Sequence, residues 1–233
     1  MRRAHRDRLP DRTGRARGPW DLAVIVVVTG TGTEVGKTWW VAGIARRLRD
    51  QGWEVAARKP AQSFDPGDDH PHDSDVLATA TGEDPRVVCP RHRSYPLAMA
   101  PPMAAEVLGR SAFNIAELAA ELAPAPGAAF VLVEGAGGPR SPLASDGDTV
   151  DLARVLGVDL VIVVADAGLG TINAVRCCTE VLRGFEVAVA LNRFDPADDL
   201  HRRNRTWLED AGFHVYAEPG GLADALAETR SRT

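Results

Sequence analysis

The sequence predicts an α/β fold with a mostly parallel sheet and helices on both faces. Two observations favour it. Short apolar runs rich in β-branched residues alternate with amphipathic helical patterns along the chain, and the chain combines 45% hydrophobic with 25% charged residues, as globular domains do. Such alternation implies parallel strands joined by right-handed crossovers. We expect residues 21–233 to form a single domain.

The first strand and the first helix are the most clearly marked pair. Residues 22–29 form an apolar, β-branched run that is too continuous for a half-exposed strand. Residues 38–51 have apolar side chains at helical spacing, and Gly52 follows as a stop signal. Within this helix, Trp39 and Trp40 are expected to pack against the sheet.

The remaining elements follow from the same patterns. Further strands are expected at 54–58, 130–134, 160–165 and 187–192, and further helices at 73–81, 114–122, 172–183, 206–211 and 222–228. The stretch 85–102, rich in Pro and Arg, is expected to be a loop-rich insertion.

Charge is concentrated at the amino terminus. Residues 1–20 hold seven Arg and two Asp, which gives +5, whereas the whole chain has a formal charge of −5. We expect this Arg-rich extension, punctuated by Gly and Pro, to be disordered. Because the basic excess lies on a tail and aromatic residues are scattered, we expect no nucleic-acid partner. Apolar runs fall short of the ~20 residues of a membrane span, and three cysteines lack metal-ligand spacing, so a cytoplasmic protein is expected.

A glycine-rich loop joins the first strand to the first helix. Residues 30–38 are Gly-Thr-Gly-Thr-Glu-Val-Gly-Lys-Thr. Glycines let backbone N–H groups face phosphate oxygens, and the helix N-terminus adds about half a positive charge. Lys37 would reach the β- and γ-phosphates, and the Thr38 hydroxyl would ligate Mg²⁺. Five residues separate the outer glycines, one more than in the strict pattern, but the order of strand, loop and helix predicts a P-loop NTPase-type fold that binds ATP. A purely structural loop is the alternative.

The second strand ends at a lysine. Lys59 lies in Arg58-Lys59-Pro60-Ala61-Gln62-Ser63, and Lys37 and Lys59 are the two lysines among 27 basic residues. Arginine carries a planar guanidinium group, whereas lysine carries a compact ammonium group that can approach a single phosphate oxygen closely. We therefore predict that Lys59 acts together with Lys37.

Two strand-end carboxylates compete for the metal. Glu134 follows one buried run and Asp166 follows another. Three of the four residues after Glu134 are glycine, which allows backbone close to a ligand, so Glu134 is favoured. Asp75 is a further candidate, but Asp73 or Ser74 would serve equally as helix caps, and spacing does not choose among these residues.

In this order, these segments resemble the dethiobiotin synthetases over residues 22–226. The matching segments are GTGTEVGKT, KPAQS, DSDVLA, APPMAAE, VEGAGGPRSPL and LGTIN, followed by the strand-end Asn192. That family converts 7,8-diaminopelargonate, CO₂ and MgATP to dethiobiotin, ADP and phosphate, through a carbamate and a carbamic-phosphoric mixed anhydride. The resemblance implies the same ligase activity in biotin biosynthesis, with Mg²⁺ as cofactor and a homodimer as the assembly.

The resemblance also implies a role for individual residues. Catalysis would involve Lys59, Lys37 and Thr33. Mg²⁺ would be held by Thr38, Asp75 and Glu134. The nucleotide and its metal would be bound by Glu34, Val35, Gly36, Lys37, Thr38, Trp39, Asp75, Glu134, Gly135, Ala136, Gly137, Asn192, Arg193 and Pro219. The substrate would be contacted by Ser63 and, across the dimer interface, by Leu169, Gly170 and Asn173.

Three positions depart from the pattern of the family. Gly32 stands where Asp is usual, Met103 where Pro-His is common, and Ala174 where His is common. Loss of the aspartate could relax nucleotide binding or substrate orientation.

Three alternatives remain open at this point. A nucleotide switch of the partitioning type would act through a protein partner, but such switches place a lysine early in the loop, where residues 31–33 contain none. A cobyrinate-type amidating ligase would need a glutaminase domain in addition. A degenerate relative would bind ATP without turnover.

Overall fold

A parallel six-stranded sheet lies at the centre of the computed structural model, which describes residues 23–123 and 125–231. The strand order is β10-β9-β8-β1-β5-β2, and every neighbouring pair in this sheet is parallel. The strands are β1 (Val24–Gly30), β2 (Val55–Arg58), β5 (Phe130–Glu134), β8 (Leu160–Asp166), β9 (Val187–Asn192) and β10 (His214–Tyr216). The expected Arg-rich extension, residues 1–20, lies outside the described residues.

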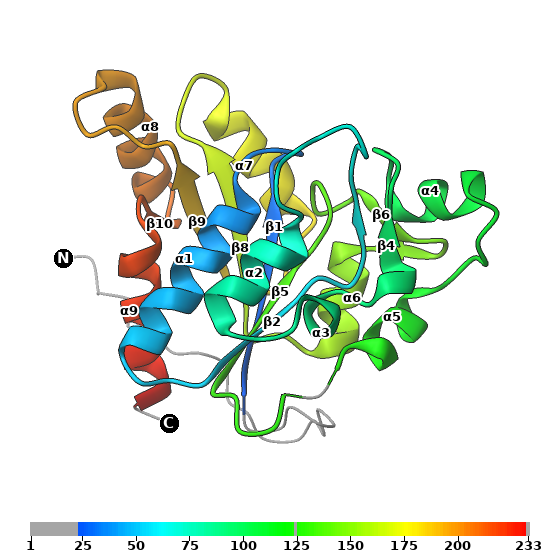
Figure 1. Ribbon diagram of the computed structural model, residues 1–233. Coiled ribbons are helices and arrows are strands. Elements are labelled where there is room, and N and C mark those ends of the chain that lie inside the picture. Colours follow the sequence, from blue (N-terminus) through cyan, green and yellow to red (C-terminus); the bar gives the residue numbers. More distant parts are fainter. Residues whose placement is uncertain (1–22, 124, 232–233) are drawn as a thin grey trace.

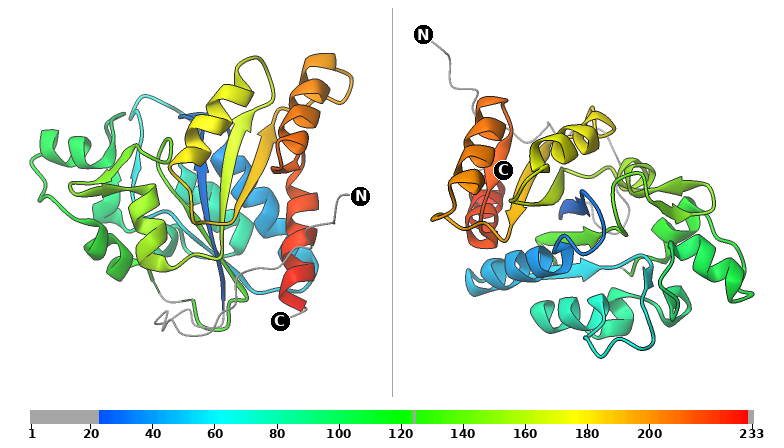
Figure 2. Two further views of the ribbon diagram at one scale, coloured as in Figure 1. Left: turned by 180° about the vertical axis from the view of Figure 1, so that it is seen from behind. Right: turned by 90° about the horizontal axis from the view of Figure 1, so that it is seen from above.

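Helices cover both faces of this sheet. Figure 1 shows α1, α2 and α9 in front of the sheet, and the left view of Figure 2 shows α6 and α7 on the opposite face. The helices are α1 (Lys37–Asp50), α2 (Asp73–Thr81), α3 (Pro85–Val88), α4 (Pro101–Val107), α5 (Ile115–Glu121), α6 (Thr149–Leu156), α7 (Thr171–Glu180), α8 (Asp199–Asp210) and α9 (Pro219–Ser231). The expected α/β architecture with helices on both faces is confirmed.

Strand β1 shows why its apolar run is continuous. Val24, Val26 and Val28 pack into the core beneath α1, α2 and α9, whereas Ile25 and Val27 pack into the core beneath α4, α5 and α6. Successive side chains of a strand point to opposite faces, so a strand covered on both faces must be apolar at every position. The strand is fully buried as a result.

Two small sheets and α4 extend the carboxyl edge of the central sheet. Strand β3 (Gln62–Ser63) pairs with β4 (Ser94–Tyr95), and β6 (Pro142–Ala144) pairs antiparallel with β7 (Gly147–Asp148). Gln62 Nε2 donates to the Ser74 and Ser94 hydroxyls, and this ties β3 to the start of α2 and to β4. The stretch 85–102 was expected to be loop-rich, but it contains α3, β4 and the start of α4.

Helices show the main differences from expectation. α8 begins at Asp199, seven residues before the expected start at 206, because the Asp198 carboxylate accepts hydrogen bonds from the Leu200 and His201 amides and caps the helix there. α6 was not predicted, although Asp148 and Asp151 form a capping box at its start.

Among the described residues, none of the helices is long and apolar enough to cross a bilayer.

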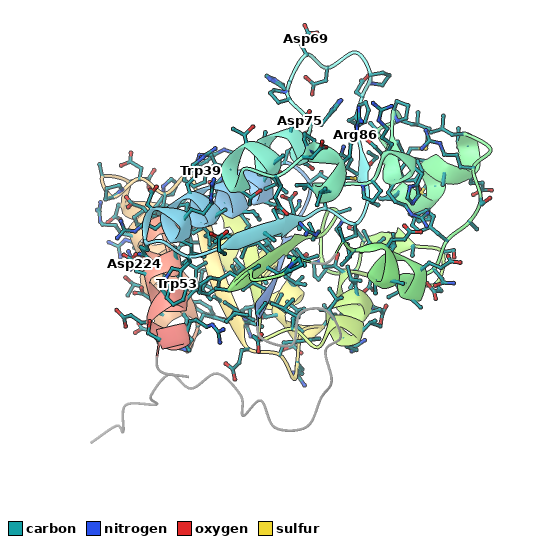
Figure 3. All side chains as sticks on the ribbon, turned by 60° about the horizontal axis from the view of Figure 1, so that its bottom comes forward. Trp39, Trp53, Asp69, Asp75, Arg86 and Asp224 are labelled. Carbon is teal, nitrogen blue, oxygen red and sulfur yellow. The ribbon has the colours of Figure 1, made fainter. Side chains whose placement is uncertain are left out.

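The two adjacent tryptophans of α1 have opposite environments, so the prediction that both pack against the sheet was wrong for one of them. Trp40 is fully buried in the core beneath α1, whereas Trp39 is 55% exposed. Figure 3 shows Trp39 at the outer side of α1. Neighbouring residues of a helix differ by about 100° around its axis, so one tryptophan faces the sheet and the next faces away from it.

This contrast predicts unequal effects on stability. Trp40→Ala should lower the free energy of unfolding by about 3–5 kcal/mol, because it leaves a cavity under α1. Trp39→Ala should change it by no more than about 0.5 kcal/mol. Urea unfolding monitored by far-ultraviolet circular dichroism compares the two variants, and equal destabilisation would contradict this packing.

Candidate active site

A cavity of about 840 Å³ opens at the carboxyl edge of the sheet. The ends of β1, β2 and β5 meet there because parallel strands bring their carboxyl ends to one edge. Its lining consists of Thr33, Glu34, Gly36, Lys37, Thr38, Lys59, Gln62, Ser63, Phe64, Asp65, Asp68, His70, Pro71, His72, Asp73, Ala98, Met99, Ala100, Pro101, Glu134, Ala136, Gly137, Ser141 and Pro142.

The glycine-rich loop curves around the Lys37 side chain. Lys37 is buried, and its Nζ donates to the Gly32 carbonyl at 2.9 Å. Gly36 has φ 95°, and a Cβ there would lie 2.1 Å from Asn192 Nδ2, so the loop requires glycine at this position. Burial lowers the pKa of Lys37, and the charge of Lys59 lowers it further. Both lysines therefore belong to one electrostatic environment.

A threonine, two carboxylates and a lysine form the floor of the cavity. Thr38 Oγ1 lies 2.8 Å from Asp73 Oδ1 and 3.0 Å from Glu134 Oε1. Lys59 Nζ contacts Glu134 Oε1 at 2.5 Å and Asp73 Oδ2 at 2.7 Å, and it donates to the Gly135 carbonyl at 3.3 Å. All three N–H donors of the Lys59 ammonium group therefore have an acceptor.

One ammonium group faces two carboxylates, and the pKa shifts reflect that imbalance. Burial alone would lower the pKa of Lys59, but the charges of Asp73 and Glu134 raise it above its ordinary value. The charge of Lys59 lowers the pKa of Asp73 to about 2. Burial raises the pKa of Glu134 despite the opposing charge of Lys59. The cluster of Lys59, Asp73 and Glu134 carries a deficit of positive charge.

The oxygen atoms of this cluster fit a hard divalent cation. Glu134 Oε2 is buried without a hydrogen-bond partner among the described residues, and Thr38, Asp73 and Glu134 supply hydroxyl and carboxylate oxygens, which Mg²⁺ prefers. Within the ranges 23–123 and 125–231, no set of three or more His, Cys, Asp and Glu side chains could hold a metal. A cation here would therefore rely on two carboxylates, the threonine and phosphate or water oxygens.

The structure brings Asp73, and not Asp75, to this cluster. Two residues along a helix lie about 200° apart around its axis, so only one of these carboxylates can face Thr38. Asp75 is absent from the cavity lining, and Figure 3 shows it on the outer side of α2. Asp73, and not the predicted Asp75, is therefore the α2 carboxylate that contacts Thr38 and Lys59, whereas the metal ligands themselves stay a prediction. The carboxylate that competed with Glu134, Asp166, is half exposed and pairs with Arg193 at 3.0 Å.

Several other residues singled out by the sequence line the same cavity. Thr33, Glu34 and Ser63 belong to its walls, together with Ala136 and Gly137. Ser63 Oγ donates to the Met99 carbonyl at 2.5 Å. Gly135 contributes its carbonyl to Lys59.

The remaining predicted site residues lie outside the cavity lining. Val35 packs against the core, and Trp39 is exposed on α1. Pro219 packs on Gly43 of α1, where a Cβ would lie 2.7 Å from the proline ring. Leu169 is 92% exposed, and Gly170 and Asn173 are exposed beside it at the start of α7. The structure does not bring these last three residues to the cavity.

Sequence reasoning did not anticipate the outer wall formed by residues 64–72. The Phe64 and His72 rings lie 3.9 Å apart, and Asp65, Asp68 and His70 complete this wall. In Figure 3, Asp69 marks the tip of the same segment, which stands out from the body of the protein. A loop of Asp, His, Pro and Gly carries no periodicity from which its position could have been predicted.

Comparisons with known proteins bear on this site. Residues 25–212 match a family described as an AAA domain. The ATP-dependent dethiobiotin synthetase of Anaeromyxobacter dehalogenans is 41% identical over 177 residues, which cover 74% of this chain and 78% of that protein. Enzymes of the same name from Haloferax mediterranei and Aquifex aeolicus are 39% and 33% identical and cover 82% and 83% of this chain, and 82% and 88% of their own lengths.

Solved structures show the fold alone at this level of identity. The cobyrinic acid a,c-diamide synthase of Mycobacterium smegmatis aligns with a TM-score of 0.50 and 17% identity, over 90% of this chain and 93% of that chain. The signal recognition particle receptor FtsY of Elizabethkingia anophelis aligns with a TM-score of 0.50 and 12% identity, over 87% of this chain and 65% of that chain. The expected P-loop NTPase-type fold is confirmed.

The charge balance of the cluster predicts a pH-dependent loss of stability. In the presence of a chelator, Lys59→Met should lower the free energy of unfolding at neutral pH by about 3–5 kcal/mol, because a buried carboxylate is left without its cation. The pKa of Glu134 is then raised further above its unfolded value, so the penalty exists above that pKa and fades as the pH falls through it. Urea unfolding at about pH 7 and about pH 5.5 should show partial recovery at the lower pH.

The matched control is the double variant Lys59→Met, Glu134→Gln. It removes both charges and should regain part of the stability at neutral pH. A single variant as stable as the wild type, or one that becomes less stable as the pH falls, would contradict the proposed charge balance.

Proposed function

The chain belongs to the family of ATP-dependent dethiobiotin synthetases, and from this premise we propose that it closes the ureido ring of dethiobiotin from 7,8-diaminopelargonate, CO₂ and MgATP. The single observation that carries the proposal is the convergence of Lys37, Lys59 and the cluster of Thr38, Asp73 and Glu134 on one cavity. The chain is a cyclo-ligase of biotin biosynthesis that uses ATP.

The reaction needs positioned reactants more than covalent help from the protein. One substrate amine adds to CO₂ to give a carbamate, and a carbamate oxygen attacks the γ-phosphorus while ADP leaves. The second amine then attacks the carbonyl carbon of the mixed anhydride, the C–O bond to phosphate breaks, and the five-membered ring closes. Holding three reactants together and neutralising the phosphoryl oxygens can supply most of the acceleration.

The residues of the cavity match these needs. Backbone amides of the loop around Gly36 and the ammonium of Lys37 bind the phosphates, at the N-terminus of α1. Lys59 stabilises negative charge at the reacting end of the triphosphate. Because its three donors are engaged by Asp73, Glu134 and Gly135, contact with a phosphoryl oxygen requires Lys59 to exchange at least one partner.

Thr38, Asp73 and Glu134 would hold Mg²⁺. When bound, this cation supplies positive charge to the phosphate oxygens. The unpartnered Oε2 of the buried Glu134 carboxylate and the hydroxyl and carboxylate oxygens that meet at Thr38 support this assignment.

Substrate contacts extend from the cavity to a neighbouring surface. Thr33 and Ser63 lie in the cavity lining, and we propose that they contact the diamine or its carbamate. Asn192 lies beside Gly36, and Pro219 lies beside Gly43 of α1; we propose that both contact the adenine. Leu169, Gly170 and Asn173 are exposed at the start of α7. We propose that they belong to a homodimer interface and contact the substrate carboxylate there. The enzyme works in the cytoplasm.

The competing functions have weaker support. A switch that acts through a protein partner is not favoured by the names of the similar proteins. Likeness to the amidating synthase rests on 17% identity and concerns the fold alone.

Phosphate release tests the proposed reaction directly. The full chain with MgATP should release phosphate at a rate that depends on both diaminopelargonate and bicarbonate, because the carbamate is the acceptor of the phosphoryl group. A coupled phosphate assay with each component omitted in turn measures this dependence. Equal release without the diamine would favour a switch, and mass spectrometry of the product should detect dethiobiotin.

The two aspartates of α2 offer a matched test of the metal site. Asp73→Asn should raise the Mg²⁺ concentration for half-maximal phosphate release by about tenfold or more, because it removes a carboxylate oxygen from the cluster. Asp75→Asn, two residues away, should shift it by no more than about twofold. Titration of both variants with Mg²⁺ at saturating ATP compares them, and the reverse order would restore Asp75 to the site.

A further inference from the structure

Two residues with unusual backbone conformations contact each other at the edge of the cavity. In the part of the chain that the structure describes, Glu34 (φ 58°) and Arg193 (φ 55°) are the non-glycine residues with positive φ. Arg193 Nη2 donates to the Glu34 carbonyl at 3.2 Å. For residues with a Cβ, the left-handed region costs free energy and persists where the surroundings enforce it. The strained backbone at Glu34 is thus held from the end of β9.

The guanidinium of Arg193 is itself anchored. Its Nη1 donates to Asp166 Oδ2 at 3.0 Å, and Asp166 Oδ1 accepts a hydrogen bond from the Gly168 amide at 2.9 Å. Asp166 also pairs with Asn192 at the carboxyl ends of β8 and β9. Asp166 therefore fixes the arginine relative to the sheet, and its pKa is lowered by the Gly168 amide and by Arg193, so the carboxylate stays charged at neutral pH.

Consecutive residues of one strand end hold the glycine-rich loop at two points. Asn192 contacts Gly36 so closely that no side chain fits there, and Arg193 engages the carbonyl two residues earlier in the loop. The hydrogen bond from Arg193 to the Glu34 carbonyl orients the peptide group that joins Glu34 to Val35. The N–H groups of this loop are the groups that must face the phosphates.

We propose that Arg193 is a positioning residue that clamps the Glu34 carbonyl to the Asp166 carboxylate and so holds the glycine-rich loop in its phosphate-binding conformation. The proposal rests on the proposed function, in which residues 30–38 bind ATP. Asp166, which the sequence offered as a metal ligand, serves here as the anchor of the clamp.

Nucleotide affinity tests the clamp in three variants. Arg193→Met, Asp166→Asn and the double variant are compared with the wild type by calorimetric titration with MgATP. Both side chains of the pair are at least half exposed, and such pairs contribute little, so each single variant should weaken binding by about three- to fivefold. The affinity of the double variant for MgATP should equal that of the single variant with the lower affinity, because either change alone opens the clamp. Arg203→Met, which breaks an exposed pair with Asp199 on α8, is the matched control and should leave the affinity unchanged.

The sign of the Asp166 effect shows whether this carboxylate acts through Arg193, because removal of a negative charge near the triphosphate would by itself tighten binding. Amide exchange without nucleotide then separates the clamp from a direct contact between Arg193 and the nucleotide, since only the clamp acts on the free loop. Amide hydrogen exchange at residues 33–36 should accelerate in both single variants without nucleotide and return to the wild-type rate at saturating MgATP.

Unchanged or tighter binding of MgATP to Asp166→Asn would overturn the clamp, as would additive losses in the double variant. The proposed reaction fails by a different observation, the absence of diamine-dependent phosphate release from the wild type. Because the affinity of each variant is measured without the diamine, the two failures are distinguishable.

Discussion

The site depends on one shared ammonium group. Lys59 lies between the Asp73 and Glu134 carboxylates, which come from a helix start and a strand end that are far apart in sequence. Burial makes each of these charges costly alone, and the contacts among them offset that cost. Lys37 acts on the same two carboxylates from a greater distance, and the unpartnered Glu134 Oε2 is the oxygen that a divalent cation would engage.

The parallel sheet makes this convergence possible. Lys59 follows β2, Glu134 ends β5, and the loop that carries Lys37 follows β1. These three strands are neighbours in the order β1-β5-β2, so their carboxyl ends deliver the three side chains to one edge. The strands β8 and β9 end at the same edge, where Asn192 lies against Gly36 of the loop, Arg193 donates to the Glu34 carbonyl, and Asp166 pairs with Arg193. In the proposed reaction, binding of phosphate and activation of the acceptor therefore belong to a single edge of the sheet.

Much of this arrangement could be predicted from the sequence, and the exceptions have physical causes. The strands at 130–134 and 187–192 were predicted to the residue, because buried parallel strands are continuous apolar runs with sharp ends. The glycines after β5 favoured Glu134 over Asp166, and Glu134 is the carboxylate that contacts Thr38.

The sequence could not choose among Asp73, Ser74 and Asp75. That choice depends on how α2 is rotated about its axis, and the packing of Leu77 and Ala78 beneath the helix decides this rotation. Helix α6 carried a readable capping box that the prediction missed, whereas the wall at residues 64–72 follows from tertiary contacts alone.

The central claim is that Lys37 and Lys59 share the phosphoryl group in transfer. A crystal structure of the full chain with MgADP, aluminium fluoride and diaminopelargonate measures this directly, because the fluoride stands in for the transferring group. The account predicts that both ammonium nitrogens lie within about 3.2 Å of the fluoride atoms. A structure in which Lys59 keeps all three of its present partners, out of reach of the fluoride, would contradict it.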